Sequence, residues 1–445
     1  MRAAAERRVM RRVRRFGAVA ATAAHVYASY RLAPLRRHRD AGRHRRNAER
    51  IYRRAVELQG LLIKVCQWLG TRADLLPPEY VEVLSRLQDR VPPRPFREIR
   101  PHLERSLGGP LEKTFARIDP VPIAAASLAQ VHEAWLHDGR RVAVKVQYPD
   151  IAALVAMDLS NLRIVFRTLQ GLERQLDFVP LIDEVERYVK EELDFLREGR
   201  SAEHMAERLG GRSDVAVPAI VWQHSTSTVL VMEFLEGIKV TDVPALRAAG
   251  IDPAGIADRL IRLYAEQILL HGFFHADPHP GNLFVQPAKT ADGEPRLVLL
   301  DFGLVKTLSE EFRRGLAQVL HAMLLGRPSE VLEKLGDIGF RNRQRTIDDM
   351  VPLVGAMLAF AGERADRLSD SEVFERFGPE LLRAYRANPL VRIPEDILLV
   401  MRVLGLLGGL GRQLGGRTNL ITALLPYAAR GAEPDSAAGA EPSGS

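Results

Sequence analysis

The sequence predicts an α+β fold with two lobes, in which the smaller lobe contains strands and the larger one is mainly helical. Apolar residues recur at helical spacing from about residue 51, alternate with a period of two from about 112, and return to helical spacing after Gly237. The expected division of the chain is a basic arm at 1–50, a helical extension at 51–111, a strand-containing lobe at 112–236, a helical lobe at 237–430 and a disordered tail at 431–445.

The N-terminal arm carries most of the basic charge. The first 54 residues contain 17 arginines, no lysine and three acidic residues, which gives +14 in a chain whose net charge is +7. An uncharged, alanine-rich segment of 15 residues lies between Arg15 and Arg31, and it is shorter than the ~20 apolar residues that span a bilayer. A membrane-surface anchor and a solvated helical arm both fit this pattern, and a nucleic-acid-binding tail is the least favoured interpretation.

Cysteine usage bears on the cellular compartment. Cys66 is the single cysteine of the sequence, so an internal disulfide and a cysteine-ligated metal cluster are both excluded. This usage is typical of a reducing environment. We therefore expect a cytoplasmic protein, which is peripheral at the membrane if the basic arm anchors it.

The strand-containing lobe opens with a β-hairpin. Segments 113–119 and 129–136 read as strands, and Asp138-Gly139 is a hairpin turn signal before "RRVAVKVQ". In this last segment the valines alternate with Lys145, which is therefore expected on the opposite face of the strand. Further expected elements are helices at 150–170 and 181–209 and strands at 217–223 and 227–237.

Three polar residues of the helical lobe have the types and spacing that phosphoryl transfer requires. "HADPHPGN" supplies Asp277 and, five residues later, Asn282, so one loop can place a carboxylate at the acceptor and an amide on a metal ion. "LLDFG" then places Asp301 at the end of an apolar strand, where a carboxylate can bridge Mg²⁺ to a nucleotide. A DFG tripeptide alone is a weak signal, but the combination downstream of a strand lysine is specific.

Lys145 requires an acidic partner to hold its ammonium group on phosphates. The helical pattern "KEELDFLREGRSAE" offers Glu192, Asp194 and Glu198. Asp194 and Glu198 are four residues apart, so on one continuous helix they would lie on a single face. A solvated acidic stripe is the alternative, and the neighbouring motifs favour the partner.

These motifs together resemble the UbiB/AarF family of atypical kinases, the coenzyme Q kinase-like group, from about Leu62 to Leu300. The resemblance rests on "KVCQ" at 64–67, "AAAS" at 124–127, "VAVKVQ" at 142–147, "ELDFLRE" at 192–198, "HADPHPGN" at 275–282 and "DFG" at 301–303. It implies a bilobal protein-kinase-like fold with an N-terminal helical extension, ATP or ADP and Mg²⁺ as cofactors, and a role in quinone or isoprenoid-lipid metabolism.

The resemblance also assigns roles to single residues. Lys145 becomes the nucleotide lysine with Glu198 as its ion-pair partner, and Asp277 becomes the catalytic-loop aspartate. The remaining assignments are Asn282 and Asp301 as magnesium ligands, Glu233 and Ala124, Ala125, Ala126 and Ser127 as nucleotide contacts, and Lys64, Gln67, Glu192 and Asp194 as regulatory residues that close the site to protein substrates.

Several positions depart from the patterns of this family and of protein kinases. Cys66 stands where the K-x-G-Q motif has glycine, which puts close packing there in doubt. Ala276 replaces the arginine of the protein-kinase H-R-D motif, and no A-P-E follows DFG, which argues against switching by activation-loop phosphorylation. The three alanines at 124–126 replace a glycine-rich loop, and their methyl groups limit how closely the backbone approaches phosphates.

Three functions are compatible with these motifs. A magnesium-dependent ATPase or a kinase of small molecules or lipids is favoured, because all four of Lys145, Asp277, Asn282 and Asp301 are present. A nucleotide-binding pseudokinase that acts as a regulatory scaffold is the alternative, and a conventional protein kinase is the least favoured. The expected partners are a nucleotide and either anionic membrane lipid or quinone-pathway proteins. The acceptor and the oligomeric state are not determined by the sequence.

Overall fold

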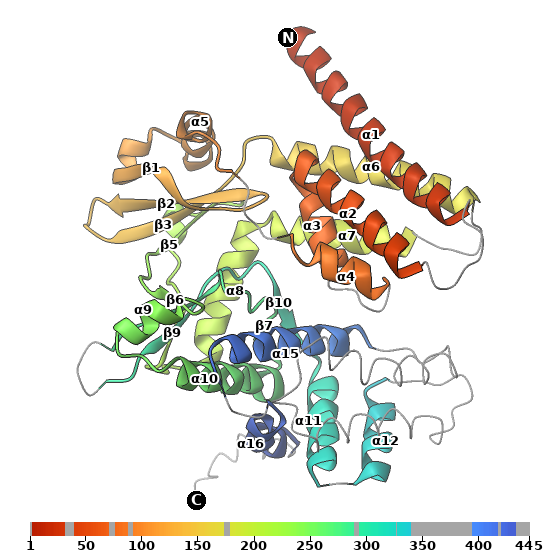
Figure 1. Ribbon diagram of the computed structural model, residues 1–445. Coiled ribbons are helices and arrows are strands. Elements are labelled where there is room, and N and C mark those ends of the chain that lie inside the picture. The colour runs from red at the N-terminus through yellow and green to blue at the C-terminus, as the bar shows by residue number, and fades with distance from the viewer. Residues whose placement is uncertain are drawn as a thin grey trace, which may run out of the picture. The chain divides into compact units, whose positions relative to one another are not determined.

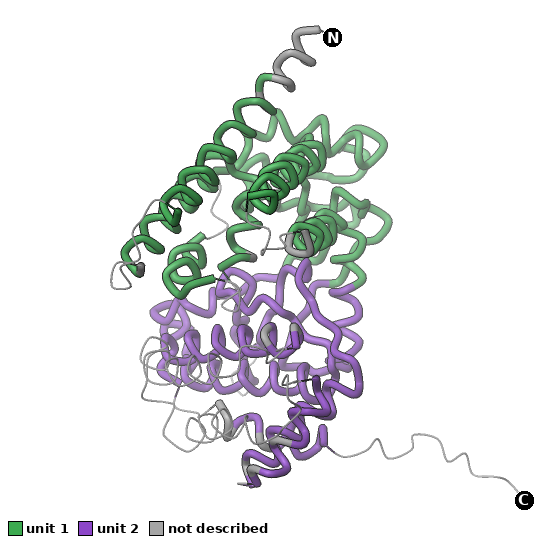
Figure 2. Tube along the Cα trace, turned by 90° about the vertical axis from the view of Figure 1, so that its right-hand side faces the viewer, with its two compact units in different colours: residues 1–200, 219–234 green, residues 201–218, 235–445 purple. Residues whose placement is uncertain are grey.

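The structure, a computed structural model, describes residues 2–31, 40–70, 76–87, 92–172, 179–288, 293–325, 327–339, 394–416 and 420–432. The chain divides into two compact units, one formed by residues 1–200 and 219–234 and the other by residues 201–218 and 235–445 (Figure 2). Nearly all of the expected tail at 431–445 lies outside the described residues, as does the part of the expected helical lobe at 340–393.

The first unit contains a group of helices (Figure 1). They are α1 (Arg2–Arg31), α2 (Asp40–Leu58), α3 (Leu61–Leu69), α4 (Pro78–Leu84), α6 (Ile151–Leu172) and α7 (Val179–Glu192). A further helix of this unit, α5 (Phe96–Leu107), lies beside the sheet instead (Figure 1) and contacts its strand β5 (Val229–Glu233). Helix α1 packs against α2 and α6, and α3 packs against α2, α4, α6 and α7. A break separates α2 from α3 because Gln59 and Gly60 have φ angles of 54° and 65°, which turn the chain at this corner.

The sheet of the first unit is antiparallel. Its strands are β1 (Phe115–Ala125), β2 (Ala129–Leu136), β3 (Arg141–Gln147) and β5 (Val229–Glu233), in the order β1-β2-β3-β5. The expected β2–β3 hairpin is confirmed, and Gly139 in its turn has a φ of 85°. The valines of β3 are buried in the core and Lys145 lies on the opposite face, as the alternation predicts.

Two expected elements of the first lobe are wrong. Residues 217–223 do not form a strand: Ile220 makes one isolated bridge to Met232, and Pro218 has no N–H to donate to a ladder. The single helix expected over 181–209 is two helices, α7 and α8 (Phe195–Arg208), which Asp194 separates.

The second unit combines two small sheets with packed helices. Its elements are β4 (Val215–Ala216), β6 (Ile238–Lys239), α9 (Val243–Ala248), α10 (Pro253–Glu266), β7 (Phe273–His275), β8 (Leu283–Gln286), β9 (Arg296–Leu299), β10 (Val305–Thr307), α11 (Glu310–Leu324), α12 (Pro328–Asp337), α15 (Glu395–Gln413) and α16 (Leu420–Ala432). One sheet has the order β4-β9-β8-β6, and β7 pairs with β10. Helix α10 packs against α15 and α16. Within the described ranges, none of the helices combines the length and hydrophobicity needed to span a bilayer.

Candidate nucleotide and phosphoryl-transfer site

Lys145 of β3 and Glu198 of α8 form a buried ion pair. The Lys145 Nζ atom lies 2.7 Å from Glu198 Oε1 and 2.9 Å from Oε2, so the carboxylate accepts from the ammonium group with both oxygens. The side chains are only 13% and 5% exposed. Nζ also lies 5.2 Å from the centroid of the Phe195 ring, where the face of an aromatic ring favours a cation. The structure thus brings together the lysine and the acid that the sequence motifs pair.

Asp194 does not share a helix face with Glu198, so the expected stacking of these two acids is wrong. Asp194 is the N-cap of α8, and its Oδ1 accepts from the backbone N–H groups of Leu196 and Arg197 at 3.1 and 3.2 Å. The N–H of Phe195 donates to Ser227 O at 3.2 Å, a contact with a distant segment that fixes the start of the helix. The cap therefore orients the first turn of α8, which carries Glu198.

The expected regulatory residues Lys64 and Glu192 also meet. Lys64 Nζ of α3 lies 3.1 Å from Glu192 Oε2 at the end of α7, and both side chains are largely buried. The Tyr188 hydroxyl donates to the other oxygen of Glu192 at 2.7 Å. The Gln67 side chain makes a different contact: its Nε2 donates to the backbone carbonyl of Leu87 at 2.9 Å.

Cys66, on the same helix, occupies the motif position where glycine is expected. It belongs to the hydrophobic core and is 4% exposed. Burial raises the pKa of its thiol to about 12, so the group stays neutral at physiological pH. Here the cysteine acts as a small core residue rather than as a reactive thiol.

The alanine-rich segment closes the β1–β2 connection. Ala124 and Ala125 are the last residues of β1, so the turn itself begins at Ala126, whose N–H donates to Ala129 O at 2.8 Å. Ser127 is 2% exposed, and its hydroxyl has no hydrogen-bond partner among the described residues. An orphaned buried hydroxyl in this turn is available to a ligand oxygen.

Glu233 is the last residue of β5. Its side chain is exposed, and Oε2 accepts from the backbone N–H of Ala219 at 3.3 Å. The N–H of Glu233 in turn donates to Ala219 O at 2.8 Å. The backbone of this segment is thus held in place on one side.

In the second unit, Asp277 and Asn282 lie together in one loop between β7 and β8. Asn282 Nδ2 donates to Asp277 O at 3.2 Å and to Asp277 Oδ2 at 3.3 Å. Two backbone bonds close the loop, from His279 N to Asp277 O at 2.7 Å and from Asn282 N to His279 O at 2.8 Å. Leu300 N donates to Asn282 O at 2.9 Å and ties this loop to the end of β9.

His275 links this loop to the turn that holds Asp301. Its Nε2 lies 3.1 Å from Leu300 O and 2.8 Å from Asp301 O, so it must donate to these carbonyls. Its Nδ1 is then the acceptor, and the Tyr264 hydroxyl lies 3.3 Å away. Burial and, to a lesser extent, the negative charge of Asp277 raise the pKa of Tyr264 well above its usual value, which keeps this hydroxyl a donor.

Asp301 has an unusual backbone conformation. It is exposed, and its φ of 60° lies in the left-handed region, which aspartate tolerates better than most residues. Its Oδ1 accepts from Gly303 N at 3.2 Å, which closes a local turn. Strained backbone of this kind is concentrated at functional sites.

Arg402 of α15 is a candidate residue that the sequence interpretation did not include. Its Nη2 lies 3.5 Å from Asp277 Oδ1. A second ion pair, between Lys306 Nζ of β10 and Asp396 Oδ1 at 2.6 Å, fastens the start of α15 to the strand after DFG. The signal in the sequence was a single arginine within the apolar run at 397–411, because a charge in such a run usually has a partner.

The donor set fits magnesium bound together with a nucleotide rather than a free-standing metal site. The described residues contain no group of three or more His, Cys, Asp or Glu side chains arranged to hold a metal ion. Mg²⁺ commonly takes one or two protein oxygens and completes its shell with phosphates and water. Asn282 and Asp301 offer oxygen donors of this kind, and Leu300 connects them through the backbone.

These features define a kinase-like protein: a strand lysine paired with a helix carboxylate in one unit, and a D-x4-N loop followed by DFG in the other. The family model described as "ABC1 atypical kinase-like domain" matches residues 86–335, more than half of the chain. The chain therefore belongs to the ABC1/AarF family of atypical kinases, and the bilobal kinase-like fold expected from the sequence is confirmed.

Named relatives agree with this assignment. The chain is 34% identical over 386 residues to AarF domain-containing protein kinase 1 of Xenopus tropicalis, covering 84% of this chain and 71% of the relative. It is 34% identical over 407 residues to the chloroplastic protein ACTIVITY OF BC1 COMPLEX KINASE 8 of Arabidopsis thaliana, covering 84% of this chain and 52% of the relative. The chain thus spans about half the length of the plant protein.

A solved structure has a similar fold. The Rv3197–erythromycin complex from Mycobacterium tuberculosis matches with a TM-score of 0.57 and 25% identity, and the match covers 85% of this chain and 94% of that one.

Proposed function

We propose that this chain binds ATP or ADP with Mg²⁺ and transfers the terminal phosphoryl group to a small molecule, a lipid or water. The observation that carries the proposal is the buried Lys145–Glu198 ion pair. Because the burial of two charges costs desolvation free energy, a functional role explains the pair better than a contribution to stability does. Asp277 and Asn282, which lie together in one loop, support it. Quinone or isoprenoid-lipid metabolism is the setting that the family resemblance favours.

In this proposal each residue has a defined task. Lys145 binds the nucleotide phosphates while Glu198 orients its ammonium group, and Asp277 positions the acceptor hydroxyl and accepts its proton. Asn282 and Asp301 supply the oxygen donors for magnesium, which when bound neutralises phosphate charge. The exposed Glu233 segment contacts the base through its backbone, and Ser127 donates to a phosphate oxygen.

The acceptor is proposed not to be a protein. Ala276 leaves the loop without the arginine that reads an activation-loop phosphate, and Lys64 and Glu192 form a largely buried pair of the kind the family uses to restrict access. A regulatory pseudokinase is the second candidate. An Asp277→Asn chain that retains its biological role without hydrolysis favours that candidate over the enzyme.

A titration tests nucleotide binding directly. The thermal unfolding midpoint of the full chain is followed with increasing Mg-ADP and Mg-ATP, since a ligand of the folded state raises it. We expect a saturable rise with either nucleotide and a smaller one with nucleotide plus a chelator. No rise with any nucleotide contradicts the proposed function.

Ala126→Gly is expected to raise affinity for ATP relative to ADP by several-fold. Removing the methyl group lets the backbone N–H groups of the turn approach the terminal phosphate more closely. The measurement is the ratio of the two dissociation constants. Ala152→Gly, on an exposed position of α6, controls for the general effect of adding a glycine. An unchanged ratio in both variants assigns Ala126 to packing alone.

We also propose that the basic arm contacts an anionic membrane surface. Met10 and Val13 on α1 are 72% and 63% exposed and lie among arginines, a pattern typical of an interfacial helix. The Met10→Ser/Val13→Ser variant is expected to float poorly with anionic vesicles that retain the parent chain. Met401→Ser, a change at a methionine of α15 that is 55% exposed, should float like the parent, and equal flotation of all three rejects the arm as an anchor.

A further inference from the structure

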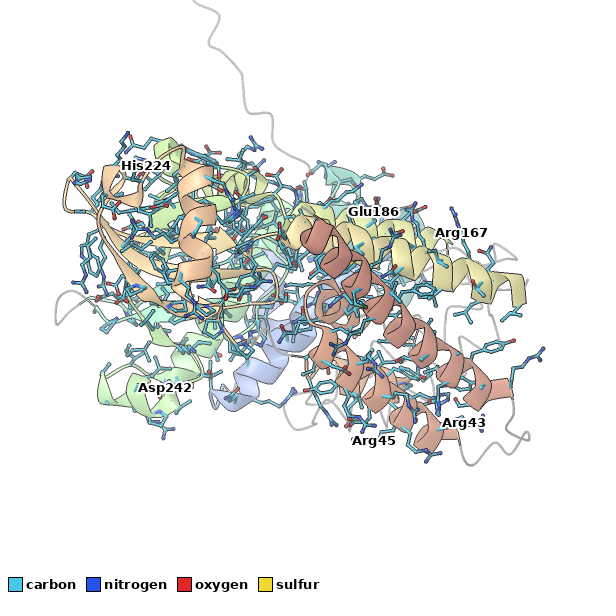
Figure 3. The ribbon with its side chains drawn as sticks, turned by 90° about the horizontal axis from the view of Figure 1, so that it is seen from above. Arg43, Arg45, Arg167, Glu186, His224 and Asp242 are labelled. Atoms are coloured by element: carbon cyan, nitrogen blue, oxygen red, sulfur yellow. The ribbon has the colours of Figure 1, made fainter. Side chains whose placement is uncertain are left out.

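One buried arginine, Arg15, joins helix α1 to α6, beside the apolar contacts of Ala18 and Val19 with the core. Arg15 donates from Nε to Asp158 Oδ1 at 2.8 Å and from Nη2 to Asp158 Oδ2 at 2.5 Å, in a bidentate pair with α6. The two side chains are 7% and 1% exposed. This arginine therefore does not belong to the solvent-facing basic surface of the arm, although the sequence places it there. Arg45, labelled in Figure 3, is exposed and is part of that surface on α2.

The same guanidinium group also holds the corner between α2 and α3. Nη1 donates to Leu58 O at 2.5 Å, and Nη2 lies 3.4 Å from Gln59 O. These carbonyls are at the C-terminal end of α2, where no helix partner remains for them. Arg15 thus fastens three elements at once, namely α1, α6 and the turn that begins α3.

The corner has little freedom to adjust. Gly60 follows Gln59 in the left-handed region, and a Cβ added at Gly60 would lie 3.3 Å from Leu154 Cδ2 of α6. The turn is therefore pressed against the same helix that carries Asp158. A change in how Arg15 holds the corner has to be passed on to α3.

Helix α3 connects the corner to the Lys64–Glu192 pair. Lys64 is four residues after Gly60, about one helical turn, and α3 spans only Leu61–Leu69. Short helices move as rigid elements, so the start of α3 sets where the Lys64 ammonium group lies. Its 3.1 Å contact with Glu192 depends on that placement.

Other polar contacts of α1 lie on both sides of Arg15. Near the C-terminal end of the helix, the Tyr30 hydroxyl lies 2.9 Å from the Tyr80 hydroxyl, and Asn47 Nδ2 donates to Ser29 Oγ at 2.7 Å. Arg12 Nη2 lies 3.4 Å from Ser160 Oγ in an exposed contact, and Arg54 Nε lies 3.3 Å from Thr22 Oγ1. The outer turns of α1 present Met10 and Val13 to solvent. Breaking the Arg15 contacts is therefore expected to loosen the N-terminal half of α1, while the contacts of Ser29 and Tyr30 and the core of the sheet remain.

We propose that Arg15 is a positioning residue for the Lys64–Glu192 pair, and that the docked arm holds this pair closed through the α2–α3 corner. The regulatory effect rests on the function proposed above, whereas the mechanical coupling does not. Binding of α1 to another surface, such as a membrane, would therefore weaken the contact between Lys64 and Glu192.

Hydrogen exchange measures the coupling without any activity. In Arg15→Gln the amides of α3 are expected to exchange at least tenfold faster than in the parent, while those of β2 and β3 are unchanged. Arg12→Gln, the same change three residues away on an exposed position, should leave α3 as in the parent. Arg15→Lys keeps a positive charge beside Asp158 but lacks the guanidinium group that also reaches the carbonyls of Leu58 and Gln59. The α3 amides of this variant are expected to exchange at a rate between those of the parent and Arg15→Gln, and the variant remains informative if Arg15→Gln folds poorly.

Nucleotide affinity, measured by titration, separates a positioning role from a structural one. Arg15→Lys and Lys64→Gln are expected to change the Mg-ADP dissociation constant in the same direction by a similar factor, and their combination should add little. Additive effects, or α3 exchange in Arg15→Lys equal to the parent, overturn the inference. If the parent binds no nucleotide, the proposed function fails alone and the exchange result still decides whether Arg15 positions α3.

Discussion

Asp277→Asn is expected to lower ATP turnover by roughly 10²- to 10⁴-fold while leaving Mg-ADP binding largely unchanged. The asparagine keeps the shape of the side chain but cannot accept the proton of an acceptor hydroxyl. In the structure Asn282 Nδ2 donates to Asp277 Oδ2 at 3.3 Å, a bond that the amide oxygen of an asparagine can also accept, so the loop should keep its shape. Turnover is measured as phosphate release by the full chain, and binding by the thermal titration.

Two further variants bracket this result. Asp337→Asn makes the same change on α12, where the exposed carboxylate pairs with Lys334, and it should leave turnover intact. Arg402→Gln removes the guanidinium group 3.5 Å from Asp277 Oδ1 and should reduce turnover less than Asp277→Asn does. Undiminished phosphate release by Asp277→Asn would show that another group does this work.

Lys145→Met is expected to abolish the nucleotide-dependent rise in the unfolding midpoint and to lower the free energy of unfolding by about 3–5 kcal/mol. The methionine fills a similar volume, but it leaves the Glu198 carboxylate, which is 5% exposed, without its buried counter-charge. An uncompensated buried charge is among the costliest changes a core can suffer. Denaturant unfolding and the nucleotide titration measure the two effects separately.

A double variant distinguishes the two roles of Lys145. Lys145→Met combined with Glu198→Gln removes both charges and should recover much of the lost stability without restoring nucleotide binding. Lys334→Met, at a surface lysine of α12 whose partners are about half exposed or more, should change stability by under about 1 kcal/mol. Nucleotide binding retained by Lys145→Met would exclude this lysine from the site.

Parts of the site were predictable because their geometry is local. Asp277 and Asn282 are five residues apart in a loop closed by its own backbone bonds, so spacing alone indicates their proximity. The alternation that buries the valines of β3 also fixes the side of the strand on which Lys145 lies. The helix of Glu198 was predicted with the wrong boundary, because Phe195 N donates to Ser227 O, and no local pattern contains that contact.

The sequence by itself determined the strand that carries Lys145, the loop of Asp277 and Asn282 and the position of Asp301, since spacing and period encode contacts within a few residues. Only the tertiary structure decided which arginines of a basic chain are structural. Arg15 reaches Asp158 across 143 positions, and Arg402 reaches Asp277 across 125. A charge removed from water requires an opposite charge nearby, and the fold supplies it from a distant part of the chain. The spacing of residues in the sequence does not predict which residue that partner is.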